Sequence, residues 1–209
     1  MIRNLSEESI TLLDKPLNAI DYVVFDFETT GINPELGDRI IEIGAVKIKA
    51  NFRISKSKFH RLIKTNAIAS KSSFDVHGIS EDELLKGCDE CVAIYDFIDF
   101  ARGCVLVAHN ASKDIAFLRH SLKDYLVDNP FEIFVDTLSL SRKLFPLASG
   151  HSLDAITERY RFKSVTGFKR HRALYDAEIT ALFFRFAVKK LFRTQCFSLF
   201  ELLEFLKRR

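Results

Sequence analysis

Two carboxylates at the end of an apolar segment are the first residues in this sequence that could do chemistry. Asp26 and Glu28 interrupt an aromatic and β-branched run at 22–27, and the turn residues Thr29, Thr30 and Gly31 follow directly. Side chains two residues apart on a strand point the same way, so both carboxylates would project together. Their repulsion makes burial without a cation unfavourable, and Mg²⁺ and Mn²⁺ prefer carboxylate oxygens. The pair predicts a metal site, with a solvated strand end as the alternative.

Two more acids stand at the starts of predicted helices. Asp114 falls in the first turn of a helix predicted at 112–125, and Asp176 in the first turn of a helix predicted at 173–192. An acid in a first turn commonly complements the helix dipole and does nothing more. Here, however, His171 precedes Asp176 with four residues between them. Four carboxylates and an imidazole in this order favour one shared site, whose histidine can exchange protons near neutral pH.

The elements that must position these residues alternate along the chain. Hydrophobic patterns predict strands at 22–27, 39–49, 52–64, 104–108 and 131–135, and helices at 6–13, 92–101, 112–125, 137–145, 152–159, 173–192 and 198–207. A further helix should begin at Ser80, which forms a capping box with Glu83, as Ser198 does with Glu201. Strands joined by short turns come first, and strands separated by helices follow. This order predicts an α/β fold with a three-layer arrangement, a mixed sheet flanked by helices.

Length and composition indicate one globular domain. The chain has 209 residues, of which 47% are hydrophobic and 28% charged, enough to bury a full core. We expect an N-terminal leader at 1–20, the main domain at 21–192 and an amphipathic C-terminal helix at 193–209. The net charge of +3 neither requires nor excludes a nucleic-acid partner. The sequence has no secretion-signal pattern and no stretch long enough to cross a bilayer, so we expect a cytoplasmic protein without a membrane partner.

The cysteines offer a weaker metal signal. Cys88 and Cys91 have a zinc-like spacing, but no second pair of Cys or His residues is suitably placed. Buried thiols are the expected role.

Four motifs, in this order, resemble those of the DnaQ-like (DEDDh-type) 3′–5′ exonucleases, which have a ribonuclease H-like fold and include proofreading subunits of the epsilon type. The motifs lie at 25–31 with Asp26 and Glu28, at 76–79, at 108–111 with Asp114, and at 171–176 with His171 and Asp176. The resemblance covers residues 20–190. It implies two divalent metal ions, Mg²⁺ or Mn²⁺, held by Asp26, Glu28, Asp114 and Asp176, with His171 as the general base.

The resemblance also implies contacts to the substrate from residues around the acids. These are Phe27, Thr29, Thr30, His77, Ile79, His109, Asn110, Lys113 and Arg172. Lys113 departs from the family, which usually has an apolar residue before the third acid. A buried, hydrogen-bonded role is the alternative for His77 and His109, and a place in the core is the alternative for Ile79. The basic segment 161–172 could guide a negative strand toward the acids, or be a solvated loop.

We therefore expect a metal-dependent exonuclease that releases nucleoside monophosphates from single-stranded or frayed DNA 3′ ends, as in proofreading or repair. Two alternatives remain: an exoribonuclease that trims RNA 3′ ends with the same acids, and a catalytically silent binding module on a polymerase. The expected protein partner is a DNA polymerase subunit or a sliding clamp. The segment 196–200 resembles clamp-binding peptides, although a packed helix start explains it equally well.

Overall fold

A mixed five-stranded sheet forms the centre of the protein, which we describe from a computed structural model at residues 5–65, 71–165, 167–194 and 197–207. The strand order is β3-β2-β1-β4-β5. β1 pairs antiparallel with β2, and β2 with β3, whereas β1 and β4, and β4 and β5, run parallel. The strands are β1 (Tyr22–Thr29), β2 (Ile40–Lys49), β3 (Arg53–Leu62), β4 (Val105–Ala108) and β5 (Phe134–Asp136).

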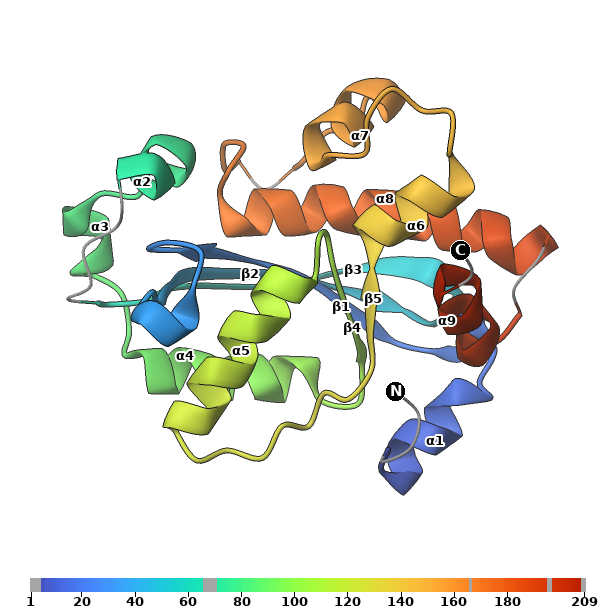
Figure 1. Cartoon of the computed structure of the whole chain (residues 1–209), viewed down its shortest axis with the longest axis horizontal. Helices are drawn as coiled ribbons and strands as arrows, with labels where there is room; N and C mark the ends of the chain where they lie inside the picture. The colour runs from blue at the N-terminus through green and yellow to red at the C-terminus, as the bar shows by residue number, and fades with distance from the viewer. Residues whose placement is uncertain (1–4, 66–70, 166, 195–196, 208–209) are drawn as a thin grey trace.

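Helices cover both faces of this sheet. In Figure 1 the long helix α8 runs along one face, with α6 and α7 beside it, and α4 and α5 lie on the other. The helices are α1 (Glu7–Leu13), α2 (Lys71–His77), α3 (Glu81–Leu84), α4 (Glu90–Ala101), α5 (Ser112–Asp124), α6 (Thr137–Leu144), α7 (Leu153–Tyr160), α8 (Ala173–Thr194) and α9 (Leu199–Lys207), with short 3-10 turns η1 (Leu17–Ala19), η2 (Pro34–Leu36) and η3 (Ala50–Phe52). The layers confirm the predicted three-layer α/β fold.

The alternation of side chains along β1 separates two hydrophobic cores. Tyr22 and Val24 pack into the core under α8, whereas Val23, Phe25 and Phe27 pack into the core under α4 and α5. Because the period of a strand is two residues, Asp26 and Glu28 fall on the α8 face. The sheet thereby presents its two acids to the helix that carries Asp176.

Most predicted elements are present, and the differences have local causes. The capping boxes at Ser80 and Ser198 both form, with Ser80 N–H donating to Glu83 and Ser198 N–H donating to Glu201. Helix α2 was not predicted from the sequence. The strand predicted at 131–135 begins only at Phe134, because Phe131 N–H donates to the side chain of Asn129 instead of a strand neighbour.

The two ends of the described chain lie side by side. Leu17 N–H donates to Phe197 O at 2.8 Å, and Leu199 N–H donates to Lys15 O at 3.2 Å. Leu13, Leu17 and Leu199 all belong to the core under α8. Figure 1 shows α1 and α9 together at one end of the molecule, opposite α2 and α3. The segments predicted as a leader and a C-terminal helix therefore contribute to the same core as the central residues.

Candidate active site

Three acids from distant parts of the chain meet on the α8 face of the sheet. Asp26 and Glu28 come from β1 and Asp176 from the first turn of α8, and one carboxylate oxygen of each lies within 4.8 Å of the others. Glu28 is only 8% exposed. An oxygen-only set of this kind suits a hard divalent cation. The predicted pair of strand acids and the predicted helix acid are thus brought together.

A glycine on β2 allows the start of α8 to come this close. Gly44 pairs with Asp26 across the sheet, and a Cβ on Gly44 would lie 2.1 Å from Leu174 N and 2.2 Å from Ala173 C. Any other residue would push the first turn of α8, and with it Asp176, away from β1. Sequence reasoning did not identify Gly44, although a glycine inside a strand pattern is a known sign of close backbone approach.

Asp114 approaches the cluster from the other side of β1. It lies in the first turn of α5, is 4% exposed, and accepts a hydrogen bond from Phe27 N–H at 3.3 Å. Its charge is close enough to raise the pKa of Asp26. Asp114 is therefore placed beside the three-acid group without belonging to it.

The acids perturb one another strongly. Burial, then the charges of Asp114, Glu28 and Asp176, raises the pKa of Asp26 well above its ordinary value. Burial followed by the charge of Asp176 raises the pKa of Glu28 to about 8. Burial raises the pKa of Asp114 to about 7 and the pKa of Asp176 to about 6. Without a cation, the folded protein thus holds protons that exposed carboxyls would have lost.

This coupling predicts that the metal-free protein loses stability as the pH rises. The folded-state pKa values are raised, so the stability is fully present below the unfolded values and is lost as the pH passes the folded values of about 6 to 8. The loss should reach a few kcal/mol, since one pKa unit corresponds to about 1.4 kcal/mol. Mn²⁺ should reverse it, raising the melting temperature by about 5–10 °C near pH 8.5 and far less near pH 5.

Thermal melts with MnCl₂ or EDTA across this pH range measure the effect, with KCl at equal ionic strength as the control. A manganese effect of equal size at both pH values would contradict the assigned coupling.

His171 stands at the edge of the cluster. It precedes α8 in a left-handed backbone conformation with φ of 60°, and its backbone N–H donates a hydrogen bond to Asp176 that lowers the pKa of that carboxyl. Partial burial, followed by the charge of Arg170, holds the pKa of His171 below its ordinary value. The imidazole is consequently neutral, and able to accept a proton, at neutral pH.

Lys113 is the cation nearest in sequence to these acids. It is exposed at the start of α5, and its charge lowers the pKa values of Asp26, Glu28 and Asp114. Lys113 makes no ion pair with any other residue that the structure describes. It therefore offsets part of the negative charge while its ammonium group stays available to a ligand.

Two of the residues predicted to contact substrate have their side chains packed inside the fold. The side chain of Phe27 is 2% exposed and packs against Phe25 and Phe97, on the opposite face from the acids. Ile79 is also 2% exposed and packs in a small core with Ile41 and Leu84. Both side chains are packed in cores, and their contact with substrate stays a prediction. For Ile79 the alternative place in the core is the one observed.

The two threonines after Glu28 hold the turn that follows β1. Thr29 Oγ1 donates to Gly31 O at 2.6 Å, and Thr30 Oγ1 accepts from Arg39 N–H at 2.9 Å. Both residues are buried. Their contact with a nucleotide stays a prediction, while their hydroxyls fix the backbone at the end of β1.

The two predicted histidines are both hydrogen-bonded and largely buried. His77 Nδ1 accepts from Ile79 N–H at 3.0 Å, so its Nε2 carries the proton, and that buried nitrogen has no partner among the described residues. His109 Nδ1 bonds with Thr137 Oγ1 at 2.9 Å, which ties it toward α6. Asn110 is exposed, and its N–H donates to Asp136 at 2.9 Å. The imidazoles of His77 and His109 are thus hydrogen-bonded within the fold, which was the alternative expected for them.

Arg172 has a structural role that sequence reasoning missed. Its guanidinium donates to Glu42 at 2.8 Å and to Glu83 at 3.2 Å, and Glu42 is fully buried. Burial alone would raise the pKa of Glu42, but hydrogen bonds from His60, Arg172 and Ala173 N–H hold it below its ordinary value. Arg172 therefore neutralises a buried acid opposite Glu28, while its contact with substrate stays a prediction. The sequence did contain a sign of this pairing, because Glu42 is an acid inside the apolar strand pattern at 39–49 and a buried acid needs a cation.

The cysteines show no metal arrangement in the described part of the chain. Cys88, Cys91 and Cys104 are free and partly buried, in line with the expected thiols. No helix in the described ranges combines the length and apolar character needed to cross a bilayer.

Known proteins share both the sequence pattern and the fold. The family model for exonucleases matches residues 23–184. The chain is 38% identical to DNA polymerase III subunit epsilon of Salmonella typhimurium over 169 residues, covering 76% of this chain and 68% of that protein. It is 37% identical to the PolC-type DNA polymerase III of Thermotoga maritima over 187 residues, covering 89% of this chain but only 13% of that protein.

Solved structures agree on the architecture. Exonuclease X in complex with 5′ overhanging duplex DNA has a TM-score of 0.68 at 24% identity, covering 88% of this chain and 99% of that chain. The nuclease domain of 3′hExo, a DEDDh family member bound to rAMP, has a TM-score of 0.69 at 17% identity, covering 87% of this chain and 96% of that chain. At these identities the likeness is one of fold, and it matches the ribonuclease H-like exonuclease arrangement expected from the sequence.

Proposed function

Since the chain belongs to the exonuclease family, we propose that it is a metal-dependent 3′–5′ exonuclease that releases nucleoside monophosphates from single-stranded or frayed DNA ends. The observation that carries the proposal is the meeting of Asp26, Glu28 and Asp176, with Asp114 alongside. Four acids at one buried place are costly unless they serve cations, so a scaffold would have no reason to contain them.

The donor set fits two divalent cations of the Mg²⁺ or Mn²⁺ class. Asp26 would serve both ions, Glu28 and Asp176 would complete one, and Asp114 would serve the other. When bound, such ions lower the pKa of a water molecule, neutralise the scissile phosphate and stabilise the leaving 3′-oxygen. The raised pKa values of these acids support the fit, because a cation is what would make their ionised forms stable together.

The remaining residues have two roles: one accepts a proton, and the others hold the acids and the substrate in place. His171 would accept a proton from the attacking water, and its lowered pKa keeps the imidazole in the neutral form that this role requires. The backbone N–H of the same residue orients Asp176, and Phe27 N–H orients Asp114. Gly44 keeps the first turn of α8 close to β1. The buried Nε2–H of His77 has no acceptor among the described residues, and we assign it a hydrogen bond to a bound nucleotide.

The biological setting is part of the proposal. The named relatives are polymerase III subunits or polymerases, which supports a proofreading or repair role beside a DNA polymerase subunit or sliding clamp in the cytoplasm. Cys196, the first residue of the suggested clamp-binding segment 196–200, lies outside the described residues, whereas Phe197 and Phe200 are exposed. An exoribonuclease is the second candidate, favoured by the likeness to 3′hExo bound to rAMP.

One digestion series tests the activity and the substrate. Labelled DNA and RNA of equal sequence would be incubated with Mg²⁺, with Mn²⁺ and with EDTA, and the products separated by size. We expect stepwise shortening from the 3′ end with release of mononucleotides, faster on DNA, and no cleavage in EDTA. Preference for RNA would select the second candidate, since only contacts to the 2′-hydroxyl distinguish the two. Binding of ends without cleavage in Mn²⁺ would instead indicate a silent module.

A further inference from the structure

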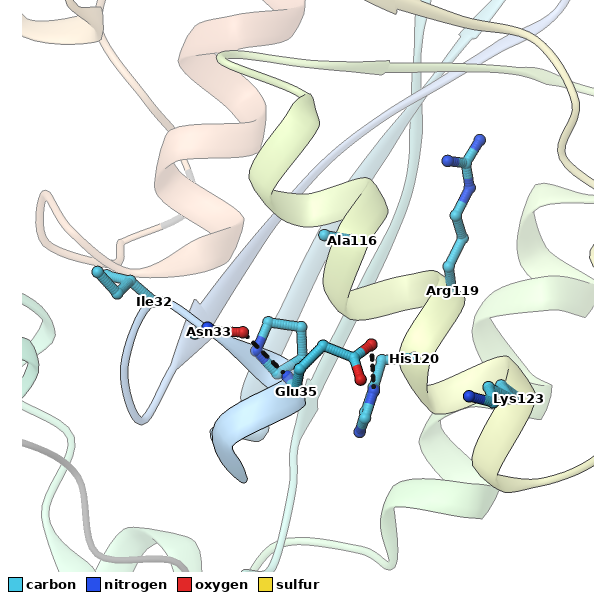
Figure 2. A pocket seen from close by; sticks show the side chains of 8 residues that line it. Ile32, Asn33, Glu35, Ala116, Arg119, His120 and Lys123 are labelled. Atoms are coloured by element: carbon cyan, nitrogen blue, oxygen red, sulfur yellow. Dashed lines mark hydrogen bonds and ion pairs between the residues drawn. The ribbon is translucent and has the colours of Figure 1, made fainter.

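A basic groove lies between α5 and the turn that follows β1. Its volume is about 430 Å³, and it is lined on one side by Asn33, Pro34 and Glu35 and on the other by Arg119, His120 and Lys123. Figure 2 shows the three basic side chains projecting from α5, with His120 directed toward Glu35 on the facing turn. No residue of this groove belongs to the acidic cluster.

Both walls of the groove begin at the acidic cluster. The turn at 32–36 continues directly from β1, which carries Asp26 and Glu28, and α5 carries Asp114 in its first turn. Lys123 lies about 13 Å along the helix axis from Asp114, at 1.5 Å per residue. This length spans about four nucleotides at the 3.4 Å spacing of a stacked strand, and fewer if the strand is stretched. A ligand that fills the groove can therefore be continuous with one held at the acids.

The face of α5 that lines the groove is basic because the spacing of its residues places cations on the side away from the core. Ile115, Phe117, Leu118 and Leu122 turn one side of α5 into the core, which leaves Lys113, Ala116, His120 and Lys123 on the solvent side with helical spacing. Arg119 and Lys123 form no ion pair with any residue in the described ranges. Arg119 and Lys123 thus add two positive charges to a lining that contains a single acid, Glu35, which lies 3.4 Å from His120. The groove thus has a net positive charge suited to an anion.

The walls are preformed. Asp38 accepts from Asn33 N–H at 2.9 Å and from Thr30 Oγ1 at 3.3 Å, which fixes the turn to the end of β1. His120 lies between Glu35 and Asp124, so it links the turn to the helix, and Arg39, just before β2, also reaches Asp124 at 3.5 Å. A preformed groove loses little conformational entropy when a ligand binds.

We propose that this groove binds the phosphates of the substrate strand on the 5′ side of the bond that is cut. The inference rests on the proposed exonuclease function, because only then must a strand extend beyond the acids. Arg119 and Lys123 contact successive phosphates without reading bases, which suits an enzyme that degrades any sequence. His120 holds the two walls together and does not contact the strand.

The test removes the two cations and compares long with minimal substrates. The variant Arg119→Gln/Lys123→Gln is matched by Lys56→Gln/Arg193→Gln, which removes the same charge from two exposed residues on β3 and at the far end of α8. The readout is the kcat/KM for a single-stranded DNA of about fifteen nucleotides divided by that for the p-nitrophenyl ester of thymidine 5′-monophosphate, which has no upstream phosphate. We expect this ratio to fall about tenfold in the groove variant and to stay near the wild-type value in the control.

Two further measurements test binding by the groove independently of cleavage. Fluorescence anisotropy of a labelled oligonucleotide without divalent cations measures binding even if the chain cuts nothing. There the groove variant should bind about tenfold more weakly, with a salt slope reduced by about 1.4. Glu35→Gln should bind more tightly, because it removes the one anion of the groove.

Equal binding and an equal substrate ratio in the groove variant and the control would overturn the proposal. Failure of the wild-type chain to cut either substrate would instead count against the proposed function alone. Weakened binding of an acidic peptide, with oligonucleotide binding unchanged, would assign the groove to a protein partner and likewise overturn the proposal.

Discussion

Asp26→Asn is expected to abolish nuclease activity and, at the same time, to stabilise the metal-free protein. The charges of Asp114, Glu28 and Asp176 all act on Asp26, which we propose serves both cations. Loss of a shared ligand removes several kcal/mol of transition-state stabilisation, so kcat should fall by about 10³-fold or more. Asp26→Ala should lose activity equally.

The gain in stability follows from the raised pKa of Asp26, which burial and then the charges of Asp114, Glu28 and Asp176 cause. Near pH 8.5 the wild-type carboxyl group either is ionised among like charges or holds a proton that it would lose in the unfolded chain. Both states reduce the free energy of unfolding, and the neutral amide of the variant avoids both. We expect the melting temperature in EDTA to rise by about 2–8 °C at that pH and to change little near pH 5. Mn²⁺ should stabilise the variant less than the wild type.

The control is Asp99→Asn, which removes an exposed acid that pairs only with Arg102 on the surface of α4. It should change neither the activity nor the melting temperature appreciably, because exposed pairs contribute about 0–1 kcal/mol. Full activity of Asp26→Asn, or full activity of the wild type in EDTA, would refute the mechanism. A folded, inactive variant without the pH-dependent stabilisation would refute the electrostatic account alone.

His171→Ala is expected to lower kcat by about 10²–10⁴-fold, the usual contribution of a positioned general base. In contrast to Asp26→Asn, it should leave the manganese-induced rise in melting temperature intact, since His171 is not one of the four residues that we propose as ligands of the cations. This difference separates loss of proton transfer from loss of metal binding. An unchanged kcat would remove His171 from the reaction.

A neighbouring variant tests the pKa of His171. The charge of Arg170 helps to lower that pKa, and Arg170 pairs with the exposed Asp154. In Arg170→Gln the pKa of His171 should rise, so the acid limb of the pH–rate profile should move to higher pH while the plateau is kept. The same change raises the pKa of Asp176, which Arg170 also lowers, and both effects act in one direction. A shift of the limb to lower pH would contradict the assignment.

The sequence alone determined the features that depend on neighbouring residues. The period of a strand placed Asp26 and Glu28 on one face, and the helical spacing of apolar residues placed Asp114 and Asp176 in first turns. These features are encoded within a few residues, because side-chain direction and helical periodicity are local. The order of strands and helices likewise sufficed for the mixed sheet and its two covered faces.

Only the tertiary structure decided which of these residues meet and which are used elsewhere. Arg172 reads as a free cation in the sequence, but packing of α8 on β2 brings it to the buried Glu42, 130 residues away in the chain. Gly44 permits that packing by leaving room for the start of α8. Phe27 and Ile79 enter the cores, and the charged face of α5 becomes one wall of a groove. Such pairings depend on how whole layers stack, and no local pattern of the sequence contains that information.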